Sequence, residues 1–263
     1  MKKIIVAVFT LVLVVNSVYA YVPFGHHTIA SLADKYLTEK ARGEVQTILK
    51  SNMIKQSNWL NSLRKKEGQE HTKDWHFFQL DANGKSTTTA ENDGVVQLEK
   101  AIEVLRNRAN QSEEAVNVAL KTVIHLVADM HCLSHIYIDG IEASRGFKFK
   151  NWNEVNGKGS NMWDAQWYNL WEQSYVNRYT FFTPQYYAND IDIYARDKRA
   201  EYEKGTPRFW VENCGEDVVR ALKDFNTGAV VPITVNHTYE FNHTKCMAKA
   251  AYRLAALLNE IFK

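Results

Sequence analysis

Residues 112–135 of this 263-residue chain read SEEAVNVALKTVIHLVADMHCLSH, and they hold its clearest structural pattern. Apolar residues dominate from Ala115 to Leu133, which predicts a buried helix over this range. Ser112 precedes two glutamates at its start, and serine in this position typically caps the first backbone N–H groups of a helix. We therefore expect a helix that begins after Ser112 and ends near Leu133.

The second half of this helix is unusually rich in histidine. His125 and Asp129 are four residues apart and share one helical face, while His135 follows just past the expected helix end. Burying such polar side chains is costly unless a partner compensates them. Nitrogen and oxygen donors of this kind favour zinc in an exported protein. The alternative is a hydrogen-bonded cluster without metal. His131 is two residues from Asp129, so it points away from the helical face that carries the other candidate ligands.

Helical periodicity also dominates the rest of the chain. Apolar residues recur at steps of three and four over residues 29–49, 96–105 and 246–262. The composition is that of a globular protein, with 45% apolar and 24% charged residues, and 4 prolines and 12 glycines are few for a many-stranded β protein. Polar segments at 81–93 and 139–159 predict loops. We predict an all-α, mainly helical fold with long loops, organised as a single domain over residues 21–263.

The first 20 residues are typical of a secretory signal peptide. Lys2 and Lys3 precede an apolar run over residues 4–15, and a small-x-small sequence ends at Ala20. An uncleaved anchor is the weaker interpretation because this run is short for a membrane span. We therefore predict cleavage after Ala20, a secreted or periplasmic location, and no stable membrane association of the mature protein.

Charge and cysteine content restrict the partners and the redox chemistry. Two of the 32 basic residues lie in the leader, so the remainder carries 30 basic and 30 acidic residues and is formally neutral. A neutral protein does not hold nucleic acid by bulk charge, so such a partner requires a local site. Three cysteines are too few for a disulfide scaffold. Cys214 and Cys246 can pair and leave Cys132 free, but the sequence alone does not decide this.

Three shorter segments carry further candidate residues. Cleavage after Ala20 makes Tyr21 the N-terminus, where its amine and carbonyl can share a metal with His26. His76 stands between aromatic residues, and Asn61 lies three residues before Arg64. Taken singly, each segment is more typical of ordinary surface or core edge than of a functional site.

Taken in order, these segments resemble a known family, the secreted zinc-dependent single-strand-specific nucleases of the mung bean nuclease type, which share a fold with zinc phospholipases C. The histidine helix is the most specific element, and the resemblance runs from residue 21 to the end of the chain. The segments that carry it are an aromatic residue followed by Gly-His (21–26), SNWLNSLR (57–64), WHF (75–77), HLVADMHCLSH (125–135), WD (163–164), WVE (210–212) and AAYRLAALLN (250–259).

The resemblance implies up to three zinc ions in a cleft of the helical domain. Tyr21 and His26 would bind one zinc, and His76 and His125 would bind a second zinc. Asp129 would bridge these two ions. His135 and Asp164 match ligands of a third zinc.

The resemblance also implies roles around the substrate. Arg64 matches an arginine that neutralises charge at the phosphate, and Phe77 matches an aromatic residue that stacks on a base, a sequence-tolerant way to hold single strands. Asn61 stands where the family has an aspartate that binds zinc and activates the attacking water. Because an amide has no negative charge and cannot accept the proton of the water, this change weakens catalysis by about 10²–10⁴ if the aspartate is the general base.

The third zinc site departs further from the family pattern N-L-H-x-x-W-D. Aligning Trp163-Asp164 with W-D keeps Asp164 as a ligand but leaves Ser160 at the histidine position. Aligning Asn161-Met162 with N-L instead places Trp163 and Trp167 at the ligand positions. Neither alignment supplies a histidine, so we expect one or two zinc ions rather than three.

These patterns predict a zinc-dependent endonuclease or phosphodiesterase that hydrolyses single-stranded DNA or RNA with metal-activated water. The expected catalytic residues are Asn61 and Arg64, with activity weakened by the altered ligands. One alternative is an inactive member of the same fold that binds zinc and nucleotides, and another is a phospholipase C. We expect a monomer whose partner is single-stranded nucleic acid or nucleotides.

Overall fold

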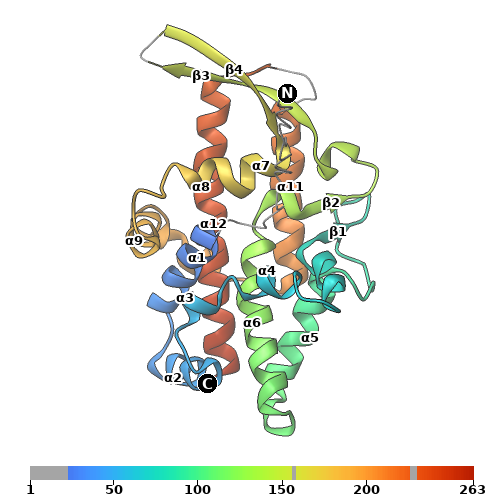
Figure 1. The fold of residues 1–263 in the computed structure, drawn as a ribbon, viewed down its shortest axis with the longest axis vertical. Coiled ribbons are helices and arrows are strands. Elements are labelled where there is room, and N and C mark those ends of the chain that lie inside the picture. The colour runs from blue at the N-terminus through green and yellow to red at the C-terminus, as the bar shows by residue number, and fades with distance from the viewer. Residues whose placement is uncertain (1–22, 156–157, 226–229) are drawn as a thin grey trace, which may run out of the picture.

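The computed structural model describes residues 23–155, 158–225 and 230–263, so the predicted signal peptide and Tyr21 lie outside the described residues. Long helices run roughly side by side, and a β-hairpin crosses one end of them (Figure 1). This confirms the mainly helical fold. The helices are α1 (Pro23–Lys35), α2 (Glu39–Leu49), α3 (Met53–Gln56), α4 (Trp59–Leu63), α5 (Gly94–Arg106), α6 (Glu113–Asp129), α7 (Trp167–Asn169), α8 (Tyr175–Asn177), α9 (Pro184–Ala195), α10 (Arg199–Tyr202), α11 (Pro207–Asp224) and α12 (Ile233–Ile261).

Helix boundaries follow local capping, which divides one predicted segment. The periodic stretch over residues 29–49 forms two helices, because the side chain of Thr38 accepts a hydrogen bond from Ala41 N at 3.2 Å and starts α2. The predicted segments at 96–105 and 246–262 lie within α5 and α12. At the start of α6, Ser112 Oγ accepts from Ala115 N at 3.1 Å, which confirms the predicted cap.

Helix α6 ends at Asp129, four residues earlier than the apolar pattern predicts. Tighter turns replace the α-helical pattern there: His131 N donates to Ala128 O, Cys132 N to Asp129 O, and a 3₁₀ helix, η3 (Leu133–His135), follows. These turns carry Cys132 and His135 off the helical path before the chain enters β2.

Within the described residues, strands form two small sheets that the sequence did not predict. β1 (Phe78–Leu80) and β2 (Ile136–Ile138) pair in parallel, and β3 (Lys148–Val155), β4 (Lys158–Gln166) and β5 (Val230–Val231) form the second sheet. The loop predicted at 139–159 is therefore partly wrong, because its second half belongs to the β3–β4 hairpin. The Gly-, Asn- and Lys-rich composition hid a local alternation in which Phe149, between two lysines, is buried and packs edge-on against Phe225.

The long helix α12 packs against several other helices. It contacts α1, α6 and α9, and α6 packs in turn against α5 (Figure 1).

Among the described residues, no helix combines the length and apolar character needed to cross a membrane. Cys132, Cys214 and Cys246 are buried free thiols, so the conceivable pairing of Cys214 with Cys246 is not formed.

Candidate metal centre

The carboxylate of Asp129, at the last residue of α6, lies at the centre of a fully buried group of histidines. The side chains around it come from four parts of the chain. From the carboxylate oxygens, the nearest ring nitrogens are His76 Nδ1 at 2.6 Å, His125 Nε2 at 3.1 Å, His26 Nε2 at 3.4 Å and His135 Nδ1 at 3.9 Å. The structure therefore brings together four histidines and the aspartate that the sequence singled out as ligands.

Three of these histidines come from three different elements of the fold. His26 lies in the second turn of α1 and stacks on His125 with ring centroids 4.1 Å apart. His76 ends the 3₁₀ helix η1 (Glu70–His76), immediately before β1. His125 lies one turn before Asp129 on α6, as the spacing of four predicts.

A backbone carbonyl orients the central imidazole. His125 Nδ1 lies 2.7 Å from the carbonyl oxygen of Ser57, to which it donates, so Nε2 faces Asp129. Imidazoles that bind metals are commonly fixed through their second nitrogen in this way. His131 has a different role, because its Nδ1 contacts Val127 O at 2.7 Å and its Nε2 accepts from Arg253 at 2.7 Å. The predicted exclusion of His131 from the ligand face is thus confirmed.

Protonation states in the cluster favour cation binding. Burial opposes ionisation of Asp129, but the adjacent imidazoles of His125 and His76 hold the pKa of its carboxyl well below the ordinary value. Burial lowers the pKa of His76 to about 4, although the neighbouring Asp129 opposes the shift. At neutral pH the aspartate is therefore ionised and His76 is neutral, which are the forms in which both groups bind metals.

The donor set of this first cluster fits a divalent cation. Ligand atoms of His26, His125 and Asp129 all lie within 4.8 Å of one another. Asp129 Oδ1 and His76 Nε2 are buried and have no hydrogen-bond partner. Since buried polar atoms are nearly always satisfied, these atoms are consistent with a cation as the missing partner. Imidazole nitrogen and carboxylate oxygen are typical zinc donors.

A second buried cluster adjoins the first and contains a residue that the sequence reading missed. Glu172 Oε1 accepts from Cys132 Sγ at 2.8 Å and lies 2.7 Å from His135 Nε2. Burial lowers the pKa of His135, but the charges of Glu172 and Asp129 and the hydrogen bond to Glu172 together raise it above the ordinary value. The carboxylate beside His135 is therefore Glu172, from the π-helix η5 (Leu170–Ser174), and not Asp164.

Asp164 has a different place in the structure. It lies in β4 opposite Lys150, its side chain is exposed, and it belongs to neither group of candidate ligands among the described residues. The expectation for Asp164 is corrected here, because the W-acid pair that reaches the site is Trp171-Glu172. That alignment places Tyr168 at the family's histidine position, and Tyr168 Oη lies 3.5 Å from His135 Nε2.

Asn61 and Arg64 lie together on the short helix α4, which packs against α6. Asn61 is buried and donates from Nδ2 to Asn58 Oδ1 at 2.9 Å. The positive charge of Arg64 lowers the pKa of both His76 and His135, although burial is the larger influence on each. The guanidinium of Arg64 therefore lies within electrostatic range of both clusters.

Phe77 lies at the edge of the buried clusters, next to a surface hollow. Its ring centroid is 5.2 Å from those of His135 and Tyr137, and it stacks on Tyr137. Both aromatic rings line a pocket of about 290 Å³ that also includes the side of β1. An aromatic wall next to the histidine clusters provides a stacking surface for a planar ligand.

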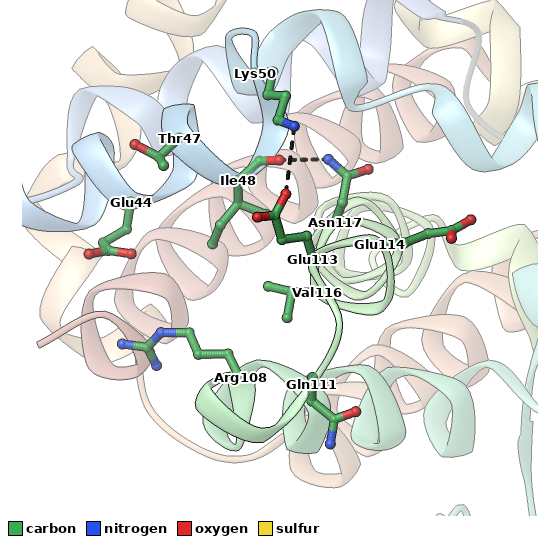
Figure 2. Close-up of a pocket in the computed structure, with 10 residues that line it drawn as sticks. All are labelled: Glu44, Thr47, Ile48, Lys50, Arg108, Gln111, Glu113, Glu114, Val116 and Asn117. Carbon is green, nitrogen blue, oxygen red and sulfur yellow. Dashed lines mark hydrogen bonds and ion pairs between the residues drawn. The ribbon is translucent and has the colours of Figure 1, made fainter.

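A larger pocket of about 770 Å³ lies away from this chemistry (Figure 2). It is formed by α2, the start of α6 and the short 3₁₀ helix η2 (Arg108–Asn110), and it contains the ion pair Lys50–Glu113. Its lining holds charges of both signs and none of the histidines. Pocket size alone therefore does not locate the functional site of this protein.

A family model described as S1/P1 Nuclease matches residues 21–263. No curated protein matches the chain.

Proposed function

The chain belongs to the S1/P1 nuclease family, and on this premise we propose that it is a zinc-dependent nuclease that hydrolyses phosphodiester bonds in single-stranded DNA or RNA. The observation that carries the proposal is the convergence of His26, His76 and His125 on Asp129 in a buried cluster. We also propose that the protein is exported after removal of residues 1–20 and acts as a monomer.

In this proposal the first cluster holds zinc through His26, His76, His125 and Asp129. The N-terminal amine and carbonyl of Tyr21 complete the donor set after the leader is removed. Tyr21 is two residues before the start of α1, the helix that carries His26, and this short separation along the sequence supports a shared site.

Zinc bound there supplies a Lewis acid that polarises the phosphate and makes water more acidic. The residues of the chain bind and orient the substrate. Arg64 offsets the negative charge of the phosphate, because its positive charge acts on both clusters. Phe77 holds a base by stacking, which requires no particular sequence.

Asn61 favours a second candidate, a zinc- and nucleotide-binding protein without turnover. The amide donates to Asn58 and cannot take a proton from water. Because a nuclease can also rely on zinc and Arg64 alone at a reduced rate, we place slow hydrolysis first.

The decisive experiment combines metal analysis with substrate digestion. The purified protein beginning at Tyr21 is expected to contain zinc and to release nucleotides from single-stranded oligonucleotides. EDTA should abolish that release, and added zinc should restore it. Bound zinc with oligonucleotide affinity but no release would establish the inactive alternative. Preferential hydrolysis of a choline phosphodiester would establish a phospholipase C, and absence of zinc would contradict all three.

Phe77→Ala tests base stacking. The substitution is expected to raise KM for a single-stranded oligonucleotide by about 5- to 150-fold, because stacking contributes about 1–3 kcal/mol per base. Hydrolysis of an abasic oligonucleotide of equal length should change little, since it has no base to stack. Phe209→Ala is the matched control, because Phe209 is an exposed phenylalanine on α11 outside the site. Equal losses on both substrates would contradict a stacking role.

A further inference from the structure

We propose that the Cys132 thiolate is a ligand of a zinc-like cation that His135 and Glu172 also hold, at the position where the resemblance implies a third zinc. The resemblance predicted only nitrogen and oxygen donors around His135, so a sulfur donor is a property of this chain. The inference builds on the proposed zinc chemistry, but it concerns a separate cluster.

The geometry of the three side chains is suitable for one cation. One potential ligand atom from each of Cys132, His135 and Glu172 lies within 4.8 Å of the other two. Glu172 Oε1 is 2.8 Å from Cys132 Sγ and 2.7 Å from His135 Nε2. All three side chains are completely buried, so the cluster is closed to competing solvent ligands.

An unsatisfied atom points to a missing partner in the cluster. Glu172 Oε2 is buried and has no hydrogen-bond partner, whereas His135 Nδ1 lies on the side of the ring toward Asp129, 3.9 Å from Oδ1. Burying a carboxylate oxygen without a partner is costly, and a bound cation would compensate it. The cysteine is therefore accompanied by a buried carboxylate that independently indicates a ligand.

The backbone presents these donors through two irregular elements. After α6 ends, η3 places His135 three residues beyond Cys132, with His135 N donating to Cys132 O at 2.9 Å. Glu172 comes from the π-helix η5, a type of helical irregularity that is frequent at functional sites. Ser134 Oγ donates to Glu172 Oε1 at 3.2 Å and supports the carboxylate from outside the three donors.

The donor chemistry selects the class of metal. One thiolate, one imidazole and one carboxylate suit zinc and similar transition metals, whereas calcium and magnesium prefer oxygen donors. Binding requires the Cys132 thiol to lose its proton to solvent as the metal–sulfur bond forms. No change in oxidation state is involved.

Cobalt(II) provides a direct test, because it replaces zinc and shows a near-ultraviolet charge-transfer band only when a thiolate binds it. The first cluster contains no cysteine, so it cannot produce this band. The cobalt-loaded wild-type protein is expected to show the band. Cys132→Ala should lose it together with one bound cobalt, while cobalt at the first cluster remains. Cys214→Ala, which removes another buried thiol in α11, should keep the band.

The outcomes separate this inference from the proposed function. Cobalt bound without the band in wild-type protein would overturn the Cys132 site and leave the first cluster intact. A band that survives in Cys132→Ala would also overturn it, because another thiol would then be the ligand. A protein that binds no cobalt would contradict both this site and the zinc dependence of the proposed nuclease. A wild-type spectrum without the band overturns the Cys132 site even if the variant does not fold.

Discussion

Asp129→Asn is expected to remove zinc from the first cluster and to lower phosphodiester hydrolysis by at least about 10²–10⁴-fold, the range for loss of a catalytic group. The imidazoles of His26, His76 and His125 all lie beside this carboxylate, and the nearest ring nitrogen is 2.6 Å from it. An amide keeps the size of the side chain but supplies no negative charge to offset a divalent cation. Elemental analysis and an oligonucleotide digestion assay on the same preparation check both effects.

Asp192→Asn is the matched control for this substitution. Asp192 is also a buried carboxylate, and it accepts hydrogen bonds from Lys35, Tyr36 and Tyr252 away from both clusters. Its replacement should lower the free energy of unfolding because these donors lose a charged acceptor. The zinc content should stay unchanged. If Asp129→Asn retains zinc and activity like this control, the first cluster is a structural hydrogen-bond network and not the metal centre.

Asn61→Asp is expected to raise kcat by about 10²-fold or more, up to the 10⁴-fold that a general base can contribute. The carboxylate would supply the charge and the proton acceptor that the amide lacks. It would also be buried on α4 and would no longer donate to Asn58 Oδ1, so the metal-free variant should unfold more readily than wild type. Zinc should then raise its melting temperature by more than that of wild type, because the metal binds only the folded state.

Asn58→Asp provides the comparison for charge alone. Asn58 lies three residues earlier, at the start of α4, and is more exposed than Asn61. The same substitution there adds a negative charge to the helix without placing it at the position matched to the family's aspartate. We expect its kcat to stay within a few-fold of wild type. Equal gains in both variants, or no gain in Asn61→Asp, would show that Asn61 does not occupy the position of the base.

Much of the site was predictable because its signals are local. The spacing of four between His125 and Asp129 places both on one face of any α-helix, whatever the rest of the chain does. Capping is equally local, and the hydrogen bond at Ser112 confirms it. The roles of Tyr21, Asn61, Arg64 and Phe77 came from the resemblance, and their chemistry stays a prediction.

Sequence alone thus determined the helical class, the family resemblance and most residues of the first cluster. Tertiary structure decided the second cluster, in which Cys132 meets a carboxylate 40 residues further along the chain. Two carboxylates follow tryptophan in that part of the sequence, Asp164 and Glu172, and the path of the β3–β4 hairpin determines which one reaches His135. Hydrophobic periodicity describes how neighbouring residues share a face, but contact between distant segments depends on packing throughout the molecule.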